Sequence, residues 1–194
     1  MNRPYRFTGA FILEGQHKAP AAGRLRWDDR ELEMVYNNSM SGHYDESDLF
    51  YMKLALEQAR EADACGEVPV GAVLVREGRV LAACRNRCEE LKDATAHAEI
   101  LALREGSRRL GGWRLTGTTL YVTLEPCPMC AGALVQARVE RLVYGAADPK
   151  GGACGTLYNL VQDERLNHRL AVTGGVMADE CAVLLQGFFR RRRG

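Results

Sequence analysis

Two short motifs in the chain carry side chains that together can bind a metal ion. His97 and Glu99 are separated by one residue, and Cys127 and Cys130 form a C-x-x-C pair directly after Pro126. Cysteine and histidine are common zinc ligands, and residues three apart lie on one face of a helix, so both sulfurs can reach one point. Two thiolates balance the charge of Zn²⁺. We therefore predict one zinc ion per chain, bound by His97, Cys127 and Cys130.

The number of ligands favours a catalytic site over a structural one. Structural zinc sites are usually closed by four protein ligands, whereas catalytic sites keep one position open for water. Zinc can lower the pKa of that water to about 7, which creates a nucleophile at neutral pH. Such a site needs a proton carrier, and the carboxylate of Glu99 is the candidate. His43 and His168 are candidates for a fourth ligand, but neither lies in a paired motif.

Each motif alone also has an ordinary explanation. A C-x-x-C pair occurs in redox proteins, and a lone histidine is more often a hydrogen-bonded core residue than a ligand. The combination favours the metal site, because both motifs lie at predicted helix starts, where the helix dipole stabilises a thiolate. The odd total of seven cysteines, without a secretion signal, argues against a disulfide framework.

The elements that must position these motifs alternate between helices and strands. Apolar periodicity and turn residues predict helices over residues 45–64, 96–110 and 126–137, and a last helix from about 179 into the final arginines. Strands are predicted over residues 70–76, 80–83, 118–124, 141–145 and 170–173, with a turn at 77–78 and a loop over 86–95. This alternation predicts an α/β layered fold with helices on a central mixed sheet.

Length and composition set further limits. The chain has 194 residues, with 26 basic and 25 acidic side chains and a net charge of +1, which excludes nucleic-acid binding by bulk charge alone. No apolar run is long enough to span a membrane, and no signal peptide is evident, so we expect a cytoplasmic protein. Residues 1–44 show no sustained periodicity and are expected to be a flexible extension or a start-site artefact. Residues 45–194 are expected to form a single zinc-dependent domain.

The combined pattern H-x-E…P-C-x-x-C is the signature of the zinc-dependent nucleobase deaminases. From about Asp48 onward, the chain resembles the bacterial tRNA-specific adenosine deaminases of the cytidine deaminase-like fold. The resemblance implies that residues 45–194 form a zinc-dependent deaminase domain of the CMP/dCMP type. The resemblance rests on residues 67–73, 93–99 and 123–131, on the Leu-Asn-His-Arg segment 166–169, and on the closing helix 181–189. Ala94 departs from the family, which often has proline there, but this change removes no ligand.

The resemblance implies a fold, a reaction and partners. The fold is a three-layer α/β/α arrangement around a five-stranded mixed sheet. The reaction is hydrolysis of adenosine to inosine at the wobble position of a tRNA anticodon, in bacteria typically that of an arginine tRNA. His97, Cys127 and Cys130 would hold zinc, and Glu99 would accept the proton of water and pass it to the base and to the departing ammonia. The family is homodimeric, with the RNA site built partly across the interface.

The resemblance also assigns substrate contacts. Asn86 matches a position that contacts the flipped nucleotide, Val70 a pocket-wall position, and Asp148 a position that contacts the RNA backbone. Taken alone, these residues are equally explained as a turn residue, a core strand residue and an Asp-Pro turn. Phe188 or Phe189 could stack on bases, and Arg192 lies in the cluster Arg190–Arg193, which could bind phosphates or form an ordinary solvated helix end.

Two alternative functions remain open at this stage. A deaminase of free guanine or cytosine would suit the Pro-Cys-Pro-Met-Cys motif, but it would not need the arginine cluster. A non-catalytic zinc protein that binds RNA as a partner subunit would suit the ligands, but it would not require an acid at Glu99.

Overall fold

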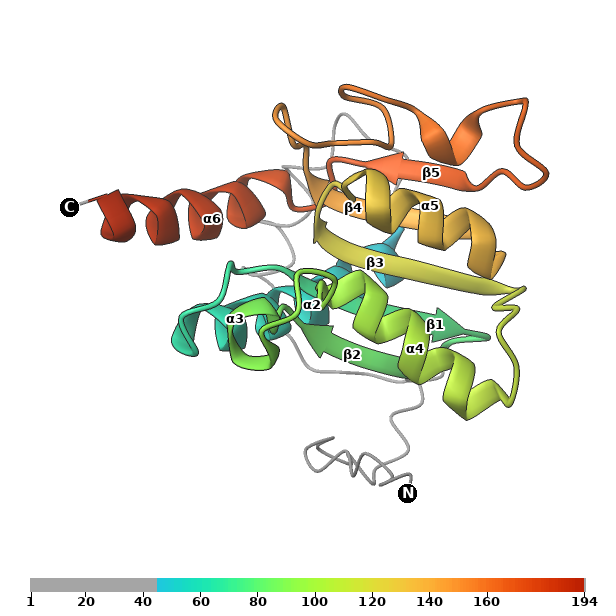
Figure 1. Ribbon diagram of the computed structural model, residues 1–194, viewed down its shortest axis with the longest axis horizontal. Helices are drawn as coiled ribbons and strands as arrows, with labels where there is room; N and C mark the ends of the chain where they lie inside the picture. The colour runs from blue at the N-terminus through green and yellow to red at the C-terminus, as the bar shows by residue number, and fades with distance from the viewer. Residues whose placement is uncertain (1–44, 194) are drawn as a thin grey trace, which may run out of the picture.

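The computed structural model describes residues 45–193, which form an α/β protein around one five-stranded sheet (Figure 1). In chain order the elements are α2 (Glu46–Ala64), β1 (Gly71–Arg76), β2 (Arg79–Arg85), α3 (Cys88–Leu91), α4 (Ala98–Leu110), β3 (Thr118–Leu124), α5 (Pro128–Ala137), β4 (Arg141–Ala146), η1 (Leu160–Gln162), β5 (Ala171–Gly174) and α6 (Ala178–Arg193). The extension expected over residues 1–44 lies outside the described residues.

The sheet is mixed, as predicted. Its strand order is β2-β1-β3-β4-β5, with β1 antiparallel to both β2 and β3. The pairs β3–β4 and β4–β5 are parallel. The parallel half places the carboxyl ends of β3 and β4 at the same edge, where loops conventionally build sites in α/β proteins.

Helices cover both faces of the sheet, which confirms the three-layer arrangement. Figure 1 shows α4 and α5 on one face and α2 behind the sheet, with α6 extending beyond it. Two apolar clusters fill the interfaces. The larger includes Leu74, Leu120 and Leu134, and the other includes Met52 and Val143. β1 is buried almost throughout, because helices pack on both of its faces.

Local sequence explains how α2 starts and how closely it packs. Asp45 is the N-cap, and its carboxylate accepts a hydrogen bond of 2.9 Å from the amide of Asp48. At Gly71 a Cβ atom would collide with the backbone of Ala55 and Ala59. Glycine at the start of β1 therefore allows α2 to lie directly on the strand.

The structure differs from the predicted elements in several places; α4, for example, begins at Ala98 and not at residue 96. The loop predicted over 86–95 contains the short helix α3, whose four residues give too little periodicity to be recognised. The helix predicted from Pro126 begins at Pro128 instead, so Cys127 is its N-cap. The 3₁₀ turn η1 was not predicted. Within the described residues, no helix is both long and apolar enough to cross a membrane.

Candidate metal centre

Two helix starts present the three predicted ligands. His97 is the N-cap of α4, and Cys127 is the N-cap of α5. Both residues have extended backbone, and neither side chain caps its own helix, so both side chains are available to a ligand. Cys130 lies in the first turn of α5 and is buried. The structure therefore places the predicted residues at two helix starts, although Cys127 precedes its helix instead of lying inside it.

The three ligand atoms converge. His97 Nδ1 lies 3.7 Å from Cys127 Sγ and 3.5 Å from Cys130 Sγ. All three donor atoms lie within 4.8 Å of one another, and no other group of this kind occurs in the described part of the chain. Zinc–sulfur and zinc–nitrogen bonds of about 2.3 and 2.0 Å place ligand atoms at similar separations around a tetrahedral ion. The donor set and its spacing therefore fit zinc.

The thiols of Cys127 and Cys130 have pKa values shifted in opposite directions. A hydrogen bond from the Cys130 thiol and a weaker contribution from His97 outweigh the cost of burial and together lower the pKa of Cys127 to about 4. The same hydrogen bond and burial raise the pKa of Cys130. Without a cation, one of the two adjacent sulfurs therefore carries the negative charge, and a bound cation would favour the second thiolate. The hydrogen bond to Cys127 raises the pKa of His97.

Glu99 lies in the first turn of α4, where its carboxylate is only 4% exposed. Burial raises the pKa of Glu99 above its ordinary value. The charge of His97 opposes this increase, and the charge of Cys127 adds to it. Its Oε2 atom is the one buried side-chain oxygen or nitrogen of the described residues without a hydrogen-bond partner. A buried carboxylate oxygen without a partner is costly, and functional sites are where such groups persist. Glu99 is therefore poised to bind a proton or a polar ligand beside the three-residue group.

Asn86 and Val70 lie next to this group. The Asn86 side-chain oxygen accepts a hydrogen bond of 3.1 Å from the amide of Ala98, and the Asn86 amide donates to the carbonyl of Val70 at 3.0 Å. Asn86 is therefore more than a turn residue, because it joins the segment before β1 to the residue that follows His97. Val70 is 6% exposed and also packs in the larger core cluster.

Asp148 lies in the loop after β4. This loop is held by Glu125, a residue for which the sequence alone indicated no role. Glu125 is 2% exposed, and its carboxylate accepts hydrogen bonds from the amides of Asp148, Cys154 and Thr156 and from the Thr156 hydroxyl. Burial opposes ionisation, but these bonds lower the pKa of Glu125. The only sequence signal was an acid at the end of an apolar strand, directly before Pro126. The Asp148 carboxylate itself accepts from the amide of Lys150.

The carboxyl-terminal arginines contact the body of the protein. Arg191 pairs with Asp63, and Arg192 donates to the carbonyl of Gly66 at 2.7 Å while lying 4.7 Å from the centre of the Phe188 ring. Phe188 is buried and Phe189 is 43% exposed, which separates a core anchor from a surface aromatic residue. These contacts place Arg192 beside the segment that leads to Val70.

The histidines considered as fourth ligands do not join the group. His168 Nε2 lies 2.7 Å from the carbonyl oxygen of Val139, on the turn between α5 and β4. In the same way, Arg138 donates to Asn167 at 2.7 Å. The Leu-Asn-His-Arg segment therefore braces this turn. His43 lies outside the described residues.

Most of the chain is similar in sequence to known deaminases. Residues 46–193 match the family model of the MafB19-like deaminases. The chain is 54% identical over 146 residues to the tRNA-specific adenosine deaminase of Bacillus subtilis, covering 75% of this chain and 91% of that one. It is 50% identical over 143 residues to the enzyme of the same name from Haemophilus influenzae, covering 73% and 83%.

The fold is also similar to a solved structure. That structure comes from work on A-to-I editing by tRNA:A34 deaminases at the wobble position of transfer RNA. It superimposes with a TM-score of 0.68 at 49% identity, covering 70% of this chain and 99% of the other. The match confirms the cytidine deaminase-like fold that the motifs indicated.

Proposed function

The chain belongs to the MafB19-like deaminases and, among deaminases, to the tRNA-specific adenosine deaminases, and on this premise we propose that it converts adenosine to inosine at the wobble position of a tRNA anticodon. We propose an arginine tRNA as the substrate. The observation that carries the proposal is the buried, unpartnered Oε2 of Glu99 beside the converging His97, Cys127 and Cys130. A tRNA substrate also favours the cytoplasm as the place of action.

We propose that His97, Cys127 and Cys130 hold one zinc ion per chain. When bound, zinc lowers the pKa of a coordinated water to about 7 and so supplies a nucleophile at neutral pH. The three residues supply two thiolates and one neutral imidazole, which leaves room for that water. A non-catalytic zinc protein would have no use for the buried acid at Glu99, whose charge costs stability.

Glu99 performs the proton transfers in this proposal. Its carboxylate accepts a proton from the water that attacks C6 of adenine and delivers it to a ring nitrogen. It then carries the second proton of that water to the amino group, which leaves as ammonia, and the ring keeps oxygen at C6. Burial suits this role, because a raised pKa brings a carboxyl group closer to neutral pH.

The substrate contacts belong to the same proposal. Val70 forms part of the pocket wall, Asn86 contacts the nucleotide that has left the stack, and Asp148 contacts the RNA backbone. Phe189 is exposed and can stack on a base, and Arg192 can approach a phosphate. An anticodon-loop adenosine is unpaired, so its extrusion costs only a few kcal/mol.

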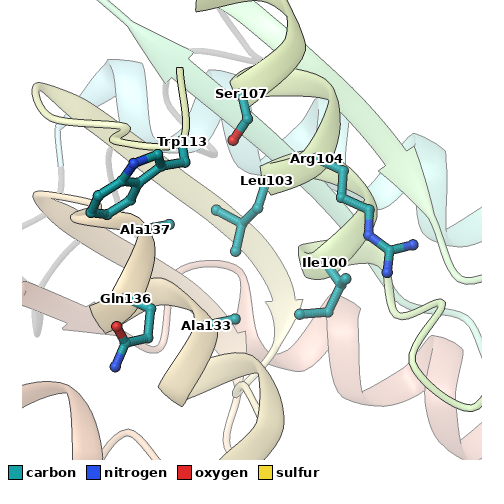
Figure 2. A pocket seen from close by; sticks show the side chains of 8 residues that line it. All are labelled: Ile100, Leu103, Arg104, Ser107, Trp113, Ala133, Gln136 and Ala137. Carbon is teal, nitrogen blue, oxygen red and sulfur yellow. The ribbon is translucent and has the colours of Figure 1, made fainter. Parts of the chain in front are cut away.

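We also propose a homodimer and assign its contact to the groove between α4 and α5. Figure 2 shows the groove lined by Ile100, Leu103, Trp113, Ala133 and their neighbours, with Trp113 from the loop after α4 at one end. Trp113 is 56% exposed, which is unusual for so large an apolar side chain. Both helices begin at metal ligands, so a second copy seated here would lie next to the site.

The experiment that tests the function compares four substrates. Ammonia release is measured with an anticodon stem-loop, guanine, cytosine and cytidine, and inosine is identified in the RNA. The proposal expects turnover of the stem-loop alone. Turnover of a free base alone would favour the free-base deaminase, and no turnover of any substrate would favour a non-catalytic zinc protein.

A further inference from the structure

One buried side chain joins the loop after β4 to the turn between β3 and α5. Glu125 Oε1 accepts hydrogen bonds of 3.0 Å from the amides of Cys154 and of Thr156. Its Oε2 accepts one of 3.0 Å from the amide of Asp148 and another from the Thr156 hydroxyl. Both carboxylate oxygens are therefore saturated by donors from a single loop.

The loop joined in this way also contacts the residue before a metal ligand. The Ala153 amide donates to the carbonyl of Pro126 at 2.9 Å, and Pro126 directly precedes Cys127. At Gly152 a Cβ atom would collide with the Glu125 carboxylate, so glycine is needed for the loop to fold over it. The backbone that leads into Cys127 is consequently held by Glu125 from one side and by the loop from the other.

We propose that Glu125 is a positioning residue for the metal centre. By binding loop 148–156, it fixes the turn that sets the position of the Cys127 sulfur relative to Cys130 and His97. The inference rests on the zinc site of the proposed function and adds a supporting residue that does not itself bind zinc. Groups that orient metal ligands in this indirect way typically contribute 10–100-fold to metal affinity or activity.

The chemistry of the partners explains why a carboxylate is needed. Three of the four bonds come from backbone amides, which can only donate. Glutamine has the same shape, but its amide group would direct a donor at one of these amides. Glu125→Gln therefore removes at least one bond and leaves a polar group buried without an acceptor, with almost no change in volume.

The test measures zinc release from purified, zinc-loaded full-length protein to a chromogenic chelator. We expect Glu125→Gln to release zinc 10–100-fold faster than the wild type, and to shift the visible absorption bands of the cobalt(II)-substituted protein. Asp48→Asn is the matched control. Asp48 is also a buried carboxylate with several hydrogen bonds, but it contacts Arg141 at the opposite end of β4. It should lower the melting temperature and leave zinc release unchanged.

Release from Glu125→Gln at the rate of Asp48→Asn would overturn the inference and make Glu125 an ordinary stabilising residue. If Glu125→Gln does not fold, Thr156→Val decides, because it removes the hydroxyl bond alone and keeps the three amide bonds. It should release zinc faster than the wild type by a smaller factor, and release at the wild-type rate would contradict the proposal. A wild-type protein that binds no zinc would instead refute the proposed function.

Discussion

The carboxylate of Asp48 accepts two hydrogen bonds of 2.7 Å from the guanidinium of Arg141, and this ion pair joins the first turn of α2 to the first residue of β4. Tyr121 donates a third bond of 3.1 Å to the same carboxylate, and Arg141 also donates to Thr173. Asp48 is 1% exposed. One buried acid therefore connects a helix with three neighbouring strands of the sheet.

Asp48→Asn should lower the free energy of unfolding by about 1–3 kcal/mol, because it leaves donors of Arg141 and Tyr121 without a full acceptor. Urea unfolding at neutral pH measures the change. Zinc content should remain at one per chain, since the network lies away from His97, Cys127 and Cys130. An unchanged unfolding midpoint would mean that solvent replaces the lost bonds at the partly exposed Arg141.

Glu99→Ala should keep zinc and the fold but lose deamination. Glu99 is not one of the three converging ligands, and proton transfer by a positioned side chain contributes about 10² to 10⁴-fold. Zinc content and single-turnover inosine formation, measured side by side, check this expectation. Glu99→Gln is the matched variant of nearly equal volume and should be equally inactive. Loss of zinc from both variants would show that Glu99 supports the metal instead of moving protons.

Cys127→Ser and Cys130→Ser should each lose zinc and become poorly soluble, because the metal joins the starts of α4 and α5 and its binding contributes to folding. Metal analysis and thermal unfolding check both effects. Cys65→Ser is the control, since Cys65 is exposed at the end of α2 and lies outside the ligand group. A variant of Cys127 or Cys130 with full zinc and normal melting would contradict the ligand assignment.

These residues also show what could be predicted from the sequence. The strands and long helices follow from apolar periodicity and from turn residues, such as Glu77 and Gly78, whose positive φ angles form the tight connection between β1 and β2. His97, Cys127 and Cys130 were recognisable as candidates because their residue types and spacing are typical of a metal site. The short helix α3 was not, because it depends on the buried Glu67, which accepts bonds from the amides of Glu89 and Glu90.

The supporting residues were missed for a different physical reason. Glu125 and Asp48 act through partners that are distant in sequence, at separations of 23 to 31 residues for Glu125 and 93 for the Asp48–Arg141 pair. A single charged residue in an amphipathic segment gives no sign of such a partner. Only the folded chain shows that these two acids are buried and fully bonded.

Glu105 provides a pH-dependent test of surface electrostatics on α4. Hydrogen bonds from Arg108, and then from Arg109, lower the pKa of Glu105 to about 2. A lowered carboxyl pKa contributes stability above the unfolded-state value near 4.5, and this contribution is lost as the pH falls towards 2. Glu105→Gln should therefore cost less than about 1 kcal/mol at pH 7, because the pair is partly exposed. Urea unfolding should show the difference shrinking from pH 5 to pH 3, and a constant difference would assign the effect to packing.

The last prediction concerns Arg192, which lies at the end of α6 against the carbonyl of Gly66. This contact places the guanidinium near the segment that leads to Val70. Asn86, whose amide donates to the Val70 carbonyl, lies at the same end of the sheet, where β1 begins and β2 ends. If Arg192 neutralises a phosphate of the anticodon stem-loop, Arg192→Ala should raise KM and reduce the slope of log affinity against log salt by about 0.7.

Arg192→Ala should leave zinc content and kcat unchanged, because no ligand or proton carrier lies in α6. It is a better test than removal of residues 191–194, since truncation would also remove the Arg191–Asp63 pair that holds α6 to α2. Arg79→Ala is the control, because Arg79 is exposed at the β1–β2 turn, at the opposite end of β2 from Asn86. Equal KM values and salt slopes for the two variants would show that Arg192 is only a structural contact of the helix end. A reduced kcat with a normal KM would instead mean that α6 affects the active site through Gly66.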